Sequence, residues 1–222
     1  MDFIFMLTRD DKTVPDCFDV LAAVAPHGVR HIGFKDMGAD KATLGRLAAE
    51  IRAAGARSYL EVVSLDAAGG MAAAELAADI KVDCLMGGTE IAGMARAIAG
   101  RGIDFMPFVG RPAGHPTALG GTADDVAEDC RRALALGCAG VDLLAYRASA
   151  ADPLALVRAA RGALGRAKLV VAGSIDGPER VRAIAEAGAD AFTIGTAVLD
   201  RRFKPGFAAI EDQLYAIHAA YM

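Results

Sequence analysis

Residues 188–195 read Gly188-Ala189-Asp190-Ala191-Phe192-Thr193-Ile194-Gly195, an order in which a small residue closes an Ala-rich amphipathic stretch and an apolar run follows. The same order occurs at His27-Gly28-Val29-Arg30 before His31-Ile32-Gly33-Phe34, and at Gly140-Val141-Asp142 before Leu143-Leu144-Ala145-Tyr146. Glycine suits the C-terminal cap of a helix, and a short apolar run is typical of a strand buried on both faces. The recurring order therefore predicts helices that lead into buried parallel strands.

Eight such apolar runs can be counted: Phe3–Thr8, His31–Lys35, Ser58–Val63, Cys84–Gly87, Phe105–Val109, Val141–Tyr146, Leu169–Ala172 and Ala191–Gly195. Helical patterns lie between them, for example at Lys41–Ala53, Met71–Ala78, Ala123–Leu136, Pro153–Leu164 and Pro178–Ala187. Eight alternations in 222 residues predict one domain, a single (β/α)₈ TIM-type barrel over residues 1–222. An open doubly wound sheet is the alternative, but it does not need eight strands. The first strand also lacks a following Gly-x-Gly-x-x-Gly motif, so no dinucleotide and no other cofactor is expected.

Composition excludes several classes of protein. With 54% hydrophobic residues the chain can bury a large core, and its net charge of −4 gives no electrostatic case for nucleic acid or an anionic membrane surface. The four cysteines, Cys17, Cys84, Cys130 and Cys138, form no Cys-x-x-Cys pair, so buried reduced thiols are expected rather than disulfides or a metal site. The N-terminus lacks a basic signal-peptide region and no apolar run reaches membrane-spanning length, which predicts a cytoplasmic protein.

Glycine-containing turns follow the seventh and eighth predicted strands, at Ala172-Gly173-Ser174-Ile175 and at Ile194-Gly195-Thr196-Ala197. Barrels of this kind often hold a phosphate group after these two strands. Glycine lets a phosphate approach the backbone, and the amides and hydroxyls of the next residues can donate to it. The alternative is that both glycines only turn the chain. The predicted phosphate-binding residues are Gly173, Ser174, Gly195 and Thr196.

The stretches Val170–Ile175 and Ala187–Val198 resemble the C-terminal quarter shared by the ribulose-phosphate-binding barrel superfamily. The likeness is specific in this quarter and becomes a shared layout elsewhere. The resemblance implies a small phosphorylated metabolite as the ligand, with its phosphate on the four residues named above. It does not choose a reaction, because this superfamily contains isomerases, epimerases, lyases and synthases.

Two enzyme families of this type are similar to different parts of the chain. N-acylmannosamine-phosphate epimerases resemble its last quarter, but they carry an acidic residue where Ala172 stands and a catalytic lysine on the third strand, where Glu61 stands. Furan-phosphate synthases of methanofuran biosynthesis share a lysine at the end of strand two, here Lys35, and an Ala-Gly-Ser-Ile run, here Ala172–Ile175. The resemblance therefore leaves the reaction open.

Two charged residues, Lys35 and Glu61, interrupt the apolar second and third strands. On period-two alternation Lys35 shares a face with Gly33 and points into the barrel mouth, where desolvation is expected to lower its pKa toward base or Schiff-base chemistry. The alternative is that the strand has already ended and Lys35 is solvated. Glu61 would be buried without a partner if it faced the helices, so we expect it to face the interior and pair with Lys35 as a catalytic acid and base. A structural ion pair, or a shifted strand that exposes Glu61, is the alternative.

Three further residues at predicted strand ends are candidates for substrate binding: Arg9, Tyr146 and Arg147. An arginine there can bind a carboxylate or phosphate bidentately. The alternative for Arg9 is an exposed loop arginine, and for Tyr146 and Arg147 it is a solvated or structural role. The segment from Gly110 to Gly121, which contains His115, is long and rich in glycine, as lids often are.

These observations leave three functions open. The first is a metal-independent isomerase or epimerase acting next to a carbonyl of a small phosphorylated sugar or related metabolite, with Lys35 and Glu61 moving protons. The second is a lyase, aldolase or synthase that forms a Schiff base on Lys35. The third is a barrel that binds a phosphometabolite without turnover, which Ala172 in place of the epimerase acid keeps open. A homodimer is a further expectation, with a C-terminal helix over Phe207–Tyr221 as a possible contributor.

Overall fold

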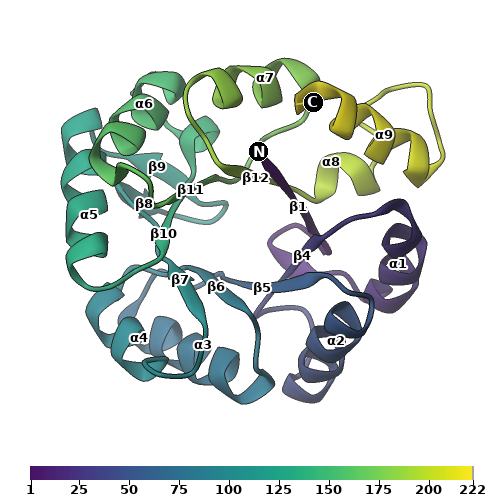
Figure 1. Ribbon diagram of the computed structural model, residues 1–222, viewed down its shortest axis with the longest axis horizontal. Helices are drawn as coiled ribbons and strands as arrows, with labels where there is room; N and C mark the ends of the chain where they lie inside the picture. Colours follow the sequence, from purple (N-terminus) through teal and green to yellow (C-terminus); the bar gives the residue numbers. More distant parts are fainter. Residues whose placement is uncertain (222) are drawn as a thin grey trace.

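The computed structural model describes residues 1–221 and contains eight parallel strands around a central axis, with helices outside them (Figure 1). The strands are β1 (Asp2–Met6), β4 (His31–Lys35), β5 (Arg57–Val62), β6 (Cys84–Gly87), β7 (Asp104–Met106), β10 (Gly140–Leu143), β11 (Lys168–Val171) and β12 (Ala191–Ile194). Ladders join them in the order β10-β11-β12-β1-β4-β5-β6-β7, and a bridge between Phe108 and Asp142 joins the two ends. The predicted (β/α)₈ barrel is confirmed.

The outer layer consists of helices that alternate with the strands. They are α1 (Cys17–Val24), α2 (Lys41–Ala53), α3 (Ala67–Ile80), α4 (Ile91–Ala97), α5 (Ala123–Ala135), α6 (Pro153–Leu164), α7 (Pro178–Glu186), α8 (Thr196–Leu199) and α9 (Ile210–Tyr221), with 3₁₀ turns η1 (Ala25–His27) and η2 (Ala145–Arg147). Two antiparallel hairpins follow the carboxyl ends of β1 and β7: β2 (Thr8–Arg9) with β3 (Lys12–Thr13), and β8 (Arg111–Ala113) with β9 (Ala118–Gly120). Both hairpins therefore stand at the end of the barrel where such folds carry their sites.

Alternation along the strands sorts their side chains into two layers. Met6, Tyr59, Met86 and Val170 belong to a cluster inside the barrel, whereas neighbouring strand residues such as Leu60 pack against the helices. Because the interior is filled by apolar side chains, a charged residue that faces inward needs a partner or a cavity. The four cysteines are buried and free, as predicted.

Several boundaries differ from those predicted, each for a local reason. The fifth ladder stops at Met106 because Pro107 has no N–H to continue it. The sixth strand ends at Leu143, and the chain turns into η2 instead of extending to Tyr146. Helix α3 starts before its predicted first residue because Asp66 caps it, accepting a hydrogen bond from the amide of Gly69.

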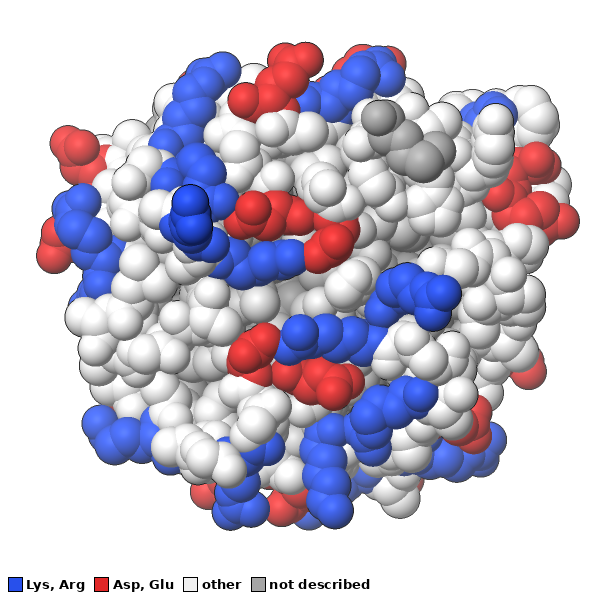
Figure 2. All heavy atoms as spheres, viewed as in Figure 1, with Lys and Arg blue, Asp and Glu red and all other residues white. Residues whose placement is uncertain are grey.

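The charged residues are distributed rather than concentrated. On the face seen in Figure 2, acidic and basic side chains lie next to one another across the centre. Among residues 1–221, no helix is long and apolar enough to cross a membrane. Within the same range, no group of three or more His, Cys, Asp or Glu side chains is placed to hold a metal ion.

Candidate active site

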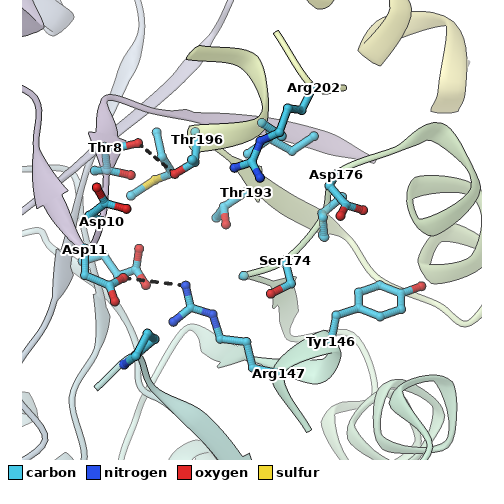
Figure 3. A pocket seen from close by; sticks show the side chains of 18 of the residues that line it. Thr8, Asp10, Asp11, Tyr146, Arg147, Ser174, Asp176, Thr193, Thr196 and Arg202 are labelled. Atoms are coloured by element: carbon cyan, nitrogen blue, oxygen red, sulfur yellow. Dashed lines mark hydrogen bonds and ion pairs between the residues drawn. The ribbon is translucent and has the colours of Figure 1, made fainter. Parts of the chain in front are cut away.

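A cavity of about 470 Å³ opens at the carboxyl ends of the strands. Lys35 and Glu61 line one side of it, and Gly173 and Gly195 line another, so the two predicted halves of the site meet in one space. The two glycines lie at the same rim of the barrel, as the phosphate prediction requires. Figure 3 shows the cavity with side chains from the β2–β3 hairpin, from η2 and from the segments after β11 and β12 directed toward it.

Lys35 and Glu61 are direct register partners on β4 and β5. Each is nearly buried, with 7% and 5% of its surface exposed. The Nζ atom of Lys35 lies 3.4 Å from Oε1 of Glu61, so the predicted contact between the two side chains is confirmed. Both charges are thus held at the floor of the cavity, where removal of either one would leave the other buried and less well paired.

Asp11 is a third member of this charged group, and sequence reasoning missed it. The Nζ atom of Lys35 donates a hydrogen bond of 2.8 Å to Oδ1 of Asp11. Asp11 and Asp10 occupy the tip of the β2–β3 hairpin with φ of 55° and 50°, the left-handed conformation that tight hairpin turns require and that Asp tolerates. Thr13 attaches this hairpin to β4, because its hydroxyl donates to the carbonyl of Lys35 and accepts from the amide of Lys35.

The expectation that the pKa of Lys35 is lowered is wrong. Burial alone lowers the pKa of Lys35, but the carboxylates of Glu61 and Asp11 outweigh burial, and the resulting pKa lies above the ordinary value of lysine. Burial likewise favours a higher pKa for Asp11, yet Lys35 and then Arg147 bring that pKa below its ordinary value. Lys35 therefore rests as an ammonium ion beside two carboxylates.

Arg147 lies between the two halves of the site. Its Nη2 is 3.6 Å from Oδ1 of Asp11 (Figure 3). Its Nη1 is 3.5 Å from the carbonyl oxygen of Thr117. On the side of the guanidinium that carries Nε, a Cβ built on Gly173 would lie only 2.5 Å from Nε of Arg147. The guanidinium thus lies between the Gly173–Ser174 turn, which we call the phosphate turn, and the Lys35–Asp11 pair, and it forms no short hydrogen bond to either.

The turn after β11 presents backbone to the cavity. Gly173 has φ of +76°, and Ser174 adopts the same left-handed region at 55°. Arg180 also lines the cavity and holds this turn, since its guanidinium donates to the carbonyl of Ser174 and pairs with Asp176 at 3.1 Å. The ring of Tyr146 lies under Arg180, with 4.8 Å from the guanidinium carbon to the ring centre. Tyr146 lines the cavity and at the same time supports this arginine.

The turn after β12 has a different reason for its glycine. A Cβ on Gly195 would lie 2.6 Å from the carbonyl oxygen of Met6 and 2.9 Å from that of Thr8, so Gly195 allows β12 and β1 to approach each other. A bulky residue at this position is therefore expected to disturb the barrel itself, rather than only to obstruct a ligand. Thr196 follows, and its hydroxyl lies 3.4 Å from the carbonyl oxygen of Thr8.

Arg202 lines the cavity together with Arg147 and Arg180, whereas Arg9 does not. The side chain of Arg9 lies outside it and forms an ion pair with Asp200 at 2.9 Å, because the hairpin turns that side chain away from the barrel axis. Arg202 also contacts Asp200, at 3.2 Å, and lines the cavity beside Thr196 (Figure 3). The prediction of Arg9 as a substrate ligand is not supported by its position.

The predicted lid contains the β8–β9 hairpin. Pro116 at its tip lines the cavity, and Nδ1 of His115 lies 3.9 Å from Oδ2 of Asp11. The β8–β9 hairpin is therefore close to Asp11, the same carboxylate that binds Lys35.

Asp142 is a further inward-facing carboxyl group in the barrel interior. It lies on β10 in register with Val170, is fully buried, and neither carboxyl oxygen has a hydrogen-bond partner within residues 1–221. Burial, with the negative charge of Glu61 in support, raises the pKa of Asp142 well above its ordinary value. The signal was present in the sequence, since Asp142 interrupts an apolar strand as Glu61 does.

The fold is shared with solved structures at low sequence identity. A structure of native KDPGal has a TM-score of 0.70 at 15% identity over 100% of this chain and 94% of its own. Thiamine phosphate pyrophosphorylase from Pyrococcus furiosus has a TM-score of 0.68 at 12% identity, over 99% of this chain and 95% of its own. A 4-hydroxy-2-oxoglutarate/2-dehydro-3-deoxyphosphogluconate aldolase has a TM-score of 0.66 at 17% identity, over 99% of this chain and 94% of its own. No protein-family model and no curated protein sequence matches the chain. The comparisons establish the barrel fold.

Proposed function

We propose that this protein is an enzyme that moves a proton next to the carbonyl group of a small phosphorylated sugar or related metabolite, as isomerases and epimerases do. One observation carries the proposal: Lys35 and Glu61 lie 3.4 Å apart on the floor of a cavity whose rim presents the Gly173 and Gly195 turns. A cavity of about 470 Å³ suits a ligand of this size.

In this proposal the phosphate group binds at the rim. The turns at Gly173–Ser174 and Gly195–Thr196 supply backbone amides and hydroxyls, and Arg202 supplies a guanidinium. The rest of the ligand then extends toward Lys35 and Glu61. Binding the phosphate fixes the position of the carbonyl relative to these two groups, which is a large part of what an enzyme contributes to such a reaction.

The chemistry follows from the charge of each group. Glu61, as a carboxylate, accepts the proton from the carbon next to the carbonyl and returns it in the closing step. Lys35, held as an ammonium ion by Glu61 and Asp11, stabilises the negative charge that develops on the carbonyl oxygen. No atom of the protein needs to become bonded to the substrate in this route.

A Schiff-base aldolase is the second candidate. Its support is the aldolase among the solved structures with this fold, together with a nearly buried lysine at the cavity. In that route Lys35 must first lose a proton, for which Glu61 is the adjacent acceptor, and its amine then attacks the carbonyl carbon. The two carboxylates beside Lys35 oppose this loss, and we therefore place the proton-transfer route first.

The test is a panel of phosphorylated aldoses, ketoses and 2-oxo acids, assayed in deuterated water by NMR. We expect deuterium to enter next to the carbonyl with the wild type, and Lys35→Met and Glu61→Gln each to reduce the rate by about 10²–10⁴-fold. Borohydride should trap no substrate on Lys35; trapping there would establish the aldolase route instead. Phosphate-dependent binding with no exchange and no product across the panel would contradict an enzyme and leave a binding barrel.

A further inference from the structure

The position of Arg147 connects the two ends of the cavity through one side chain. Nε of Arg147 lies against Gly173, at the turn to which the proposed function assigns the phosphate. Nη2 of the same guanidinium lies 3.6 Å from Asp11, which in turn binds Lys35 at 2.8 Å. The guanidinium group is planar and rigid, and its nitrogens point in different directions. One arginine can therefore donate hydrogen bonds at both ends of the cavity.

The guanidinium is free to take a ligand. Its side chain is only 24% exposed, and yet its shortest polar contacts within residues 1–221 are 3.5 Å to Thr117 and 3.6 Å to Asp11. An arginine in this setting normally forms several shorter hydrogen bonds, because each of its five N–H groups loses water on burial. A phosphate oxygen at the Gly173 turn would provide the missing acceptor.

The charge of Arg147 already acts on the reaction end. Its positive charge opposes the rise in the pKa of Lys35, on which burial, Glu61 and Asp11 have larger effects, and it adds to the fall in the pKa of Asp11, on which burial and Lys35 have larger effects. His115 is the other cation near Asp11, at 3.9 Å, and Glu61 is the other anion beside Lys35. Neutralising Arg147 by a bound anion therefore favours the ammonium form of Lys35 and leaves Asp11 with Lys35 and His115 as its neighbouring cations.

We propose that Arg147 is a positioning residue that couples occupancy of the phosphate turn to the state of the Lys35–Asp11 pair. The proposal rests on the proposed function for the place of the phosphate. When phosphate binds at Gly173, the guanidinium turns its hydrogen bonds toward the phosphate and releases Asp11. A phosphorylated substrate is then favoured over its unphosphorylated analogue in the rate of the chemical step as well as in binding.

The test uses inorganic phosphate as the probe and the ligand-free protein as the starting state. The carboxyl carbon of Asp11 is titrated by NMR with and without saturating phosphate, while the amides of Ser174 and Thr196 report binding. We expect phosphate to raise the proton affinity of Asp11 by about threefold or more, which corresponds to about half a pKa unit. The Nε–H resonance of Arg147 should shift over the same phosphate concentrations.

The informative variant is Arg147→Lys. It keeps the positive charge at the phosphate turn, but a single ammonium group cannot address both ends, so phosphate should still bind while the response of Asp11 falls below half of the wild-type response. Arg182→Lys, on an exposed arginine of α7 outside the cavity, should respond like the wild type.

Two outcomes would overturn the coupling, and a third separates it from the proposed function. An unchanged Asp11 at saturating phosphate, or a full response in Arg147→Lys, contradicts the role of Arg147 while phosphate binding at Ser174 and Thr196 stands. No phosphate response at those amides in the wild type contradicts the phosphate site itself, and the coupling fails with it.

Discussion

The ammonium nitrogen of Lys35 lies 2.8 Å from a carboxylate oxygen of Asp11, although the two residues are 24 positions apart and belong to a barrel strand and a hairpin tip. This contact changes the chemistry expected of Lys35. A buried lysine with one carboxylate partner is a candidate for a neutral amine, whereas a lysine between two carboxylates remains charged. The hairpin after β1 thus favours electrostatic stabilisation over nucleophilic attack at this position.

Replacing Lys35 by Met should reduce turnover by about 10²–10⁴-fold and leave the barrel intact. Met fills a similar volume without a charge, so Asp11 loses its hydrogen bond and its main cation, and the pKa of Asp11 should rise. Turnover is measured on the panel substrate that the wild type converts, and folding by thermal unfolding. Lys41→Met, on an exposed lysine of α2, is the control and should retain full turnover. Normal turnover by Lys35→Met would remove Lys35 from the catalytic group.

Replacing Arg202 by Gln should weaken binding of inorganic phosphate by about 10- to 150-fold, because a hydrogen bond to a charged group contributes about 1.5–3 kcal/mol. Titration calorimetry or the amide shifts of Ser174 and Thr196 measure the affinity. The control is Arg182→Gln, which removes an exposed arginine outside the cavity. Equal affinities for the two variants would show that Arg202 does not hold the anion.

Replacing Gly195 by Ala should destabilise the fold by about 1–3 kcal/mol, since the new methyl group would meet the carbonyl oxygens of Met6 and Thr8. The free energy of unfolding in urea measures the effect. Gly162→Ala is the control, because it lies in helix α6 with open space around its Cβ position and should stabilise the protein by about 0.5–1 kcal/mol. A stable Gly195→Ala variant that has lost only phosphate binding would mean that this glycine serves ligand binding and not the packing of β12 against β1.

Replacing Asp142 by Asn should stabilise the protein at neutral pH. The raised pKa of Asp142 means that its contribution to stability is fully present below its unfolded value near 3.8 and is lost as the pH rises through the folded pKa. Asn does not titrate, so the advantage of the variant should grow by about 1.4 kcal/mol for each pH unit between the unfolded value near 3.8 and the raised folded pKa, and should level off above it.

Urea unfolding at several pH values measures this difference in stability. Asp79→Asn is the control, because Lys41 holds the pKa of this exposed carboxyl group below its ordinary value, so the stability of this variant relative to wild type should not grow with pH. A stability difference between Asp142→Asn and wild type that stays constant with pH would mean that Asp142 titrates normally despite its burial.

The sequence by itself determined the barrel and the contact at its floor. Strands covered by helices on one side and packed against the barrel interior on the other must be apolar on both faces, so they appear as short uninterrupted runs that alternation can count. The same rule makes an exception such as Glu61 visible, and the adjacency of consecutive strands brings Glu61 to Lys35. Asp142 is a second carboxyl group within an apolar strand, so its burial inside the barrel could have been predicted in the same way.

Only the tertiary structure decided which loop residues complete the site. Arg9 and Asp11 follow β1 and Arg202 follows α8, and the residues next to each of them do not show which side chain reaches the cavity. Asp11 reaches Lys35 because Thr13 of the same hairpin is hydrogen-bonded to the backbone of Lys35 on β4. Arg9 belongs to this hairpin too, but its side chain points outward to Asp200. Periodicity fixes the direction of a side chain within a strand, but in a turn that direction depends on backbone angles and long-range hydrogen bonds, which no local pattern encodes.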